Sequence, residues 1–144
     1  MGAEEHAILC GDVEATAACA AAFARQLEPG QIIFLEGPLG AGKTTFVRAM
    51  ARALGADDRD VVSPTYAMVQ EVPLAPGVLV HLDLYRLEHP EDAFALGLEA
   101  LPEGAIVAIE WPERGGSSLG APDWRVQIRP VGEARQIVIE PVSG

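Results

Sequence analysis

The stretch GPLGAGKTTF, residues 37–46, decides the fold that we expect for this chain. It matches the pattern G-x-x-x-x-G-K-[ST], whose fixed positions are Gly37, Gly42, Lys43 and Thr44. The apolar run 31–36 precedes it, and the helix-forming residues 43–54 follow it. Glycines in this context let successive N–H groups turn toward an anion, and the start of the helix adds a positive field. The stretch predicts a phosphate-binding loop in which Lys43 reaches the β- and γ-phosphates and the Thr44 hydroxyl binds Mg²⁺.

Lys43 is the only lysine among the 144 residues, although ten residues are lysine or arginine. Arginine carries a broad planar fork, whereas lysine is a compact charge on a slim stem that fits inside a loop wrapped around phosphate. The position of the single lysine therefore favours the phosphate-binding interpretation. The alternative is a plain glycine-rich turn at the start of a helix.

Helix-forming stretches and apolar runs alternate along the rest of the chain. We expect helices at 13–27, at 43–54 and from near Pro90, strands at 31–36 and 104–110, extended segments at 66–72 and 78–84, and a C-terminal hairpin of 124–129 and 135–140. This order is typical of helices covering a mostly parallel sheet. We predict a single α/β domain over residues 1–144, of the P-loop NTPase type, with a mostly parallel sheet flanked by helices and a C-terminal β-hairpin.

Two acids end apolar runs that we expect to be strands: Asp83 closes GVLVHLD and Glu110 closes GAIVAIE. Parallel strands end at the same edge of a sheet, so both acids are expected to face the phosphates. One should hold Mg²⁺ and the other should orient the attacking water, but the sequence does not assign which. Each acid can instead mark a strand's exit into solvent.

Other candidates lie near these positions. Thr65 in SPTY can sense the γ-phosphate or the metal, or belong to a plain turn. His81 is interpreted as a structural histidine within an apolar run. Trp111 can pack near the nucleotide or fill the core, and we weigh these two roles equally. Arg86 can contact phosphate or pair with a nearby acid, and we weigh these two roles equally as well.

The charge balance argues against direct binding of nucleic acid. Twenty-one acidic and ten basic residues give a formal net charge of −11, and no run of lysine and arginine is present. A protein that neutralises phosphates needs such a surplus. No apolar stretch has the length of a membrane span and the N-terminus lacks the features of a signal peptide, so we expect a cytoplasmic protein. Cys10 and Cys19 lack metal or redox spacing and are assigned no chemistry.

The motifs LGAGKTTF, SPTY, HLDLYRL and IEWP, in this order, resemble the bacterial TsaE (YjeE) family over residues 31–112. That family comprises ATPases needed to form threonylcarbamoyladenosine in tRNA. The resemblance implies a P-loop fold, ATP and Mg²⁺ as cofactors, and work in a complex with TsaB and TsaD, through which tRNA is reached only indirectly.

The resemblance also implies roles for individual residues. The phosphates would be held by Gly37, Gly40, Ala41, Gly42, Lys43, Thr44 and Thr45. The metal candidates are Thr44, Glu110 and Asp83, and the catalytic candidates are Asp83, Glu110 and Thr65. Asp12 and Arg135 are candidates for contacts with the base. Pro38 departs from the family, in which an acidic residue is common at this place.

Two other functions are weighed against this one. A small-molecule kinase needs a lid and an acceptor site, for which the P-loop and its sheet leave little chain. A GTP-binding module would read guanine with an Asn-Lys-x-Asp motif, which a chain whose only lysine is Lys43 cannot contain. With no lid apparent, we expect hydrolysis that is slow in the isolated protein and stimulated by partners.

Overall fold

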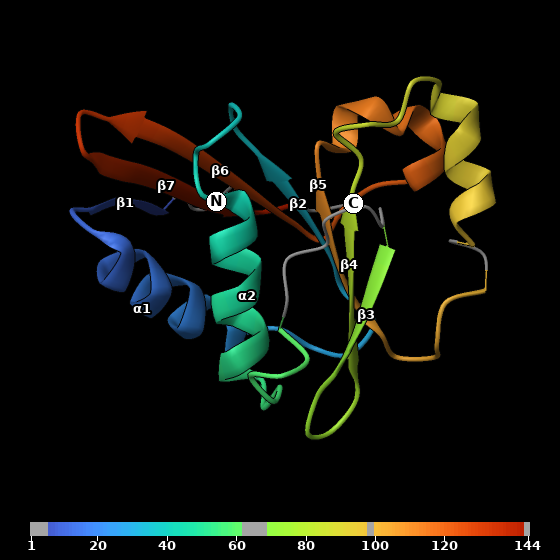
Figure 1. Ribbon diagram of the computed structural model, residues 1–144, viewed down its shortest axis with the longest axis horizontal. Helices are drawn as coiled ribbons and strands as arrows, with labels where there is room; N and C mark the ends of the chain where they lie inside the picture. Colours follow the sequence, from blue (N-terminus) through green and yellow to red (C-terminus); the bar gives the residue numbers. More distant parts are fainter. Residues whose placement is uncertain (1–5, 62–68, 98–99, 143–144) are drawn as a thin grey trace.

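The computed structural model describes residues 6–61, 69–97 and 100–142. These residues form one seven-stranded sheet, in the order β1-β7-β6-β2-β5-β4-β3, with helices on both faces (Figure 1). The strands are β1 (His6–Cys10), β2 (Ile32–Glu36), β3 (Val69–Pro73), β4 (Val78–Asp83), β5 (Ile106–Glu110), β6 (Trp124–Val131) and β7 (Ala134–Pro141). The helices are α1 (Val13–Ala24), α2 (Lys43–Ala53) and the 3₁₀ helices η1 (Pro90–Leu96), η3 (Pro112–Arg114) and η4 (Gly116–Leu119). None of these helices is long and apolar enough to span a membrane.

The centre of the sheet is parallel and its margins are antiparallel. β6, β2, β5 and β4 run in one direction, because β2 pairs parallel with β6 and β5, and β4 pairs parallel with β5. β7 and β3 run in the opposite direction. β1 is antiparallel to β7, so β1 runs in the same direction as the four central strands. Five of the seven described strands therefore share a direction. This confirms the predicted α/β fold with its mostly parallel sheet, and β6 and β7 form the predicted C-terminal hairpin.

Besides the short 3₁₀ helices η3 and η4, the sequence analysis does not predict the edge strand β1. It pairs with β7 from His6↔Ile139 to Cys10↔Arg135, across almost the whole length of the chain. Ile8 and Leu9 within it are 40% and 66% exposed. A short edge strand of this kind depends on backbone hydrogen bonds to a distant partner, and neither alternation nor burial marks it in the sequence.

Alternate residues of the central strands enter two separate hydrophobic cores. Ile33 and Leu35 of β2 lie in the core beneath α1 and α2, whereas Phe34 lies in the core on the opposite face. α1 and α2 pack against each other on the first face, and η1 packs against η4 on the second (Figure 1). Strands covered on both faces are apolar along their whole length, which explains the continuous runs in the sequence. On β4, alternation from Leu79 places His81 and Asp83 on the face that α2 covers.

Candidate functional site

The loop between β2 and α2 forms the base of a concave site. It enters α2 at Gly42, whose backbone is left-handed with φ 104° and which caps the helix without a side-chain hydrogen bond. The positive end of α2 therefore faces the loop without a side-chain acceptor from its cap. Gly37 has φ 153°, and a Cβ there would clash with the carbonyl oxygen of Ile128 on β6. Backbone geometry thus requires both glycines of the motif.

Lys43 is folded into this loop and is only 4% exposed. Its ammonium group donates hydrogen bonds to the carbonyl oxygens of Gly37 and, over 3.3 Å, Pro38. Its Nζ atom also lies 3.7 Å from the centroid of the Trp111 ring, which gives a close cation–π contact. Burial lowers the pKa of Lys43 below its ordinary value, and the carboxylate of Glu110 opposes that shift. The site therefore contains a poorly hydrated positive charge, which an anion would stabilise.

A cavity of about 310 Å³ opens beside the loop at the carboxyl ends of the parallel strands. Residues 39–45 line one side of it, and Asp83 and Glu110 line it from the ends of β4 and β5. The two acids are register partners in the pairing of these strands. The structure therefore brings both predicted carboxylates to the loop, at the edge where strand ends meet. Thr65, the third predicted catalytic residue, lies outside the described residues.

The two acids have different environments. Glu110 is 3% exposed, and its Oε2 atom accepts a hydrogen bond of 2.7 Å from the Thr44 hydroxyl and lies 2.6 Å from His81 Nε2. Asp83 is half-buried and accepts a hydrogen bond of 3.1 Å from the backbone N–H of Tyr85. Glu110 is thus fixed within the protein, while Asp83 is partly open to solvent.

A second cavity of about 390 Å³ lies against the glycine loop, lined by different parts of the chain. Asp12 and Arg135, the residues predicted to contact a base, both line it. Asp12 caps α1 by accepting a hydrogen bond of 2.8 Å from the Ala15 N–H, and Arg135 donates one of 3.0 Å to the carbonyl oxygen of Ala41 in the loop. Gly40, Ala41, Gly42 and Thr45 line both cavities, so the two spaces both border the loop.

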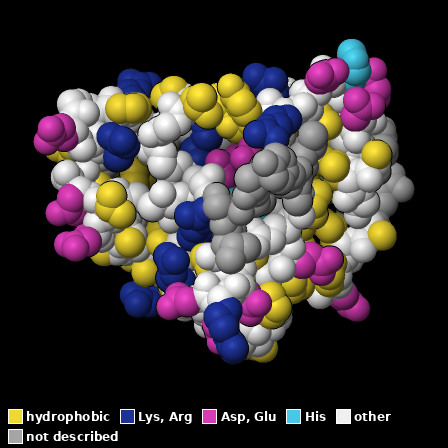
Figure 2. All heavy atoms as spheres, in the orientation of Figure 1, with side chains coloured by type: hydrophobic (Ala, Val, Ile, Leu, Met, Phe, Trp, Pro, Cys, Tyr) yellow, Lys and Arg dark blue, Asp and Glu magenta, His cyan; other side chains and the backbone are white. Residues whose placement is uncertain are grey.

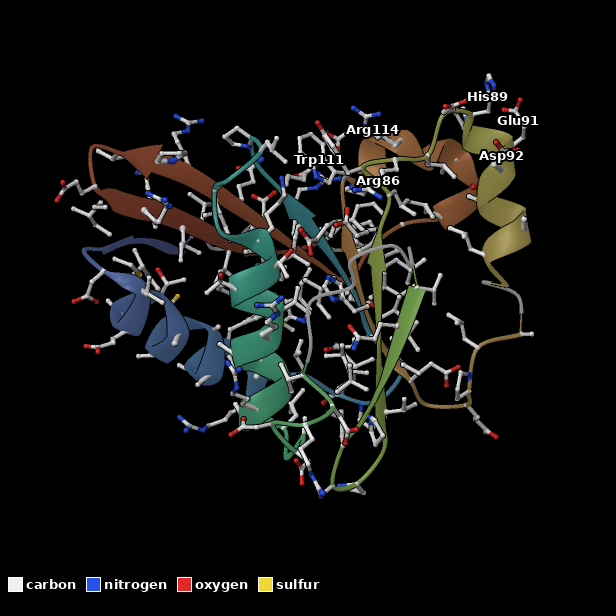
Figure 3. All side chains as sticks on the ribbon, in the orientation of Figure 1. Arg86, His89, Glu91, Asp92, Trp111 and Arg114 are labelled. Atoms are coloured by element: carbon white, nitrogen blue, oxygen red, sulfur yellow. The ribbon has the colours of Figure 1, made fainter. Side chains whose placement is uncertain are left out.

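Two aromatic side chains close one wall of the first cavity: Tyr85, which the sequence analysis did not single out, and Trp111, for which it weighed a place near the nucleotide and a place in the core equally. Tyr85 and Trp111 line it, with ring centroids 5.1 Å apart, and the Arg114 guanidinium lies 5.2 Å from the Tyr85 ring. Trp111 has φ 58°, and among the described residues it is the one non-glycine residue with a positive φ. Figure 3 shows Trp111, Arg86 and Arg114 together at this end of the sheet, and His89 well away from them. A strained backbone of this kind is often found at functional sites.

A parallel sheet whose strand β2 passes through a glycine loop into a helix, with a lysine and strand-end acids around one cavity, defines a fold of the P-loop NTPase type. Solved structures agree with this. The crystal structure of YdiB from Bacillus subtilis superposes with a TM-score of 0.67 and 25% identity, covering 99% of this chain and 89% of that one.

The family model "Threonylcarbamoyl adenosine biosynthesis protein TsaE" matches residues 10–137, and the chain belongs to this family. Relatives named tRNA threonylcarbamoyladenosine biosynthesis protein TsaE include that of Nostoc sp., 42% identical over 112 residues, 74% of this chain and 68% of the relative. The protein of Haemophilus influenzae is 39% identical over 76% of this chain and 70% of its own length. The protein of Rickettsia felis is 35% identical over 74% of this chain, which matches only 62% of the relative's length. The family predicted from the four motifs is confirmed.

Proposed function

We propose that this protein binds ATP with Mg²⁺ and hydrolyses it, and that it acts with TsaB and TsaD in forming threonylcarbamoyladenosine in tRNA. The observation that carries this proposal is the convergence of the glycine loop, Lys43 and two strand-end carboxylates on one cavity. Membership of the TsaE family supports the role in tRNA modification. The role of the nucleotide is argued from the residues of the two cavities.

The phosphates of ATP would occupy the cavity over the start of α2. Backbone N–H groups of the loop and the helix end favour an anion there, and Lys43 would exchange its carbonyl partners for phosphate oxygens. The nucleoside would extend across the loop into the second cavity, toward Asp12 and Arg135. The loop residues shared by the two cavities would then hold the middle of the nucleotide.

The oxygen atoms at the first cavity fit Mg²⁺. Thr44 offers a hydroxyl, and Glu110 and Asp83 offer carboxylates, which are the ligand types that this hard cation prefers. Across residues 6–61, 69–97 and 100–142, no group of three or more His, Cys, Asp or Glu side chains could hold a metal alone. This fits a metal that is held by one or two protein oxygens together with the phosphates, whose charge it neutralises when bound.

In hydrolysis the two acids would have different roles, because their environments differ. Glu110 is already hydrogen-bonded to Thr44, the residue whose hydroxyl is expected at the metal, so we assign Glu110 to the metal side of the site. Asp83 lies at the more open position and would orient the attacking water. Charge that develops on the γ-phosphate would be stabilised by Lys43 and the loop N–H groups.

The proposed role is cytoplasmic and depends on partners. A net charge of −11 does not favour binding to the phosphates of tRNA. Figure 2 shows acidic and basic side chains interspersed over the described part of one face, without a continuous basic surface. At the rim of the first cavity, Leu39 is 69% exposed and Tyr85 is 38% exposed. A partner surface that covers this rim would exclude water and complete the site, which is why we expect stimulation by TsaB and TsaD.

Titration calorimetry with ATP and GTP, each with and without Mg²⁺, tests the nucleotide proposal, and product analysis tests the chemistry. We expect ATP to bind, Mg²⁺ to raise its affinity, and ADP and free phosphate to form in equal amounts. ADP without free phosphate would instead indicate transfer to an acceptor, as in a kinase. No binding of either nucleotide would overturn the proposal.

A further inference from the structure

We propose that His81 is a positioning residue, which holds the Glu110 carboxylate in the orientation that the Mg²⁺ site and hydrolysis require. This inference rests on the proposed ATPase function and names a residue for which sequence reasoning favoured a purely structural role. His81 is buried, with 3% exposure, and its contact with Glu110 is among the shortest side-chain contacts of the site.

The register of the sheet explains why these two residues meet. Asp83 of β4 is the partner of Glu110 on β5, and His81 is the partner of Ala108. His81 is therefore the diagonal neighbour of Glu110, two residues back along β4 and on the same face of the sheet. α2 covers this face and supplies Thr44 from its first turn. Strand pairing and one helix start thus bring a histidine, a carboxylate and a hydroxyl into contact.

The hydrogen bonds among His81, Glu110 and Thr44 involve only one of the two carboxylate oxygens of Glu110. A carboxylate that holds Mg²⁺ is ionised and only accepts hydrogen bonds, so in the proposed site His81 Nε2 would carry the hydrogen and donate across the 2.6 Å contact, while Thr44 donates over 2.7 Å. Among the described residues, all the side-chain hydrogen bonds to Glu110 fall on Oε2. When the Thr44 hydroxyl turns toward a metal, His81 is the donor that keeps Oε2 in place. Because Glu110 lines the cavity, its other oxygen, Oε1, would be the one available to a metal there.

The position of His81 separates it from residues that would touch the nucleotide. Among the described residues that line the cavity of about 310 Å³, Glu110 and Asp83 are present and His81 is not. Its influence must therefore pass through Glu110. Partners that orient a metal ligand in this way are typically worth about 10- to 100-fold in metal affinity or activity. A purely structural histidine would affect stability without this selectivity.

Two amide substitutions that differ in reach provide the test. His81→Gln keeps an N–H donor near the place of Nε2, whereas His81→Asn carries the same group on a side chain one methylene shorter. We expect His81→Asn to lower kcat about 10- to 100-fold and to reduce the gain in ATP affinity that Mg²⁺ provides, while ATP affinity without metal is unchanged. His81→Gln should recover most of both quantities. The control is His89→Leu, at an exposed histidine away from the site, which should match the wild type.

A double-mutant cycle shows whether His81 acts through Glu110. In a Glu110→Gln background, His81→Asn should cause no further loss of kcat or of the Mg²⁺-dependent affinity gain, because the carboxylate that it positions is gone. Additive losses, equal behaviour of the Asn and Gln variants, or a parallel loss of metal-free affinity would overturn the inference. If the wild type releases no phosphate, the proposed function fails, and the Mg²⁺-dependent affinity gain still decides the role of His81.

Discussion

At the scale of single residues, Lys43 carries the argument for phosphate binding, because its charge is buried and close to the centre of the loop. Lys43→Ala should weaken ATP binding by about 1.5 to 3 kcal/mol, the range for a hydrogen bond to a charged group. Lys43→Arg should also weaken it, since a guanidinium is too broad for the space between the loop carbonyls and the Trp111 ring. Calorimetry measures both, with the exposed Arg129→Ala as control. Unchanged affinity in the arginine variant would contradict this account of the single lysine.

Asp83 and Glu110 allow binding to be separated from chemistry. Asp83→Asn and Glu110→Gln keep the shape of each side chain and remove its charge. The rate of hydrolysis should therefore fall about 10²-fold, as is typical for loss of a catalytic group. The affinity for ATP without metal should change little. Phosphate release and calorimetry provide the two measurements, and Asp92→Asn, an exposed acid on η1, provides the control. Turnover at the wild-type rate in both variants would return these acids to a structural role.

Sequence reasoning at this scale succeeds where a motif fixes the chemistry and fails where geometry decides. The loop residues and both strand-end acids were predicted, because a strand's end can be read from the pattern of apolar residues. His81 was assigned a structural role because its partner Glu110 lies 29 positions away and becomes a neighbour only through the β4–β5 register. The contact of Trp111 with Lys43 likewise depends on a backbone conformation that its residue type does not favour.

At the scale of elements, the start of the glycine loop depends on close packing against β6. Gly37→Ala combines a positive φ with a clash against the carbonyl oxygen of Ile128, whereas Gly30→Ala has a positive φ, 86°, and no atom within 4 Å of the added Cβ. Gly37→Ala should therefore lower the free energy of unfolding more than Gly30→Ala, which should cost about 1 kcal/mol. Urea unfolding monitored by circular dichroism compares the two. Equal losses would show that β6 does not confine the loop.

α1 contains a second testable feature, the half-buried thiol of Cys19. Burial, assisted by the neighbouring Cys10 thiol, raises the pKa of Cys19 to about 11. Since the folded pKa is raised above the unfolded one, this contribution to stability is present below the ordinary thiol pKa of about 8.5 and is lost as pH rises toward 11. The urea midpoint of the wild type should therefore fall more between about pH 8 and pH 10.5 than that of Cys19→Ala. The same dependence in both would contradict the assignment.

Elements were predictable in proportion to their burial. β2 and β5 are apolar on both faces, and both were identified within two residues of their observed ends. β1 was missed because it lies at the edge, with Leu9 largely exposed, and is held by β7 from the other end of the chain. Local patterns record which faces are covered, whereas a strand fixed mainly by distant backbone pairing leaves little trace in its own residues.

At the scale of the whole molecule, the net charge and the exposed rim of the site support the proposal that the protein acts on a partner complex rather than on RNA directly. A net charge of −11 opposes binding to polyphosphates, whereas the proposed site, a cavity with a buried lysine, would take one triphosphate at the loop. Filter binding of labelled tRNA to the isolated chain should therefore show only weak retention at physiological salt. Tight retention would contradict the indirect role, and the complex with TsaB and TsaD is the positive control.

The central claim is that the glycine loop and the strand-end acids form an ATPase that partners complete. The most direct test is steady-state phosphate release at saturating ATP and Mg²⁺, from the protein alone and with purified TsaB and TsaD, with Glu110→Gln carried through both conditions. We predict slow release alone, a marked increase with the partners, and loss of that increase in the Glu110→Gln variant. Release that the partners leave unchanged, or stimulated release that survives in Glu110→Gln, would contradict the account.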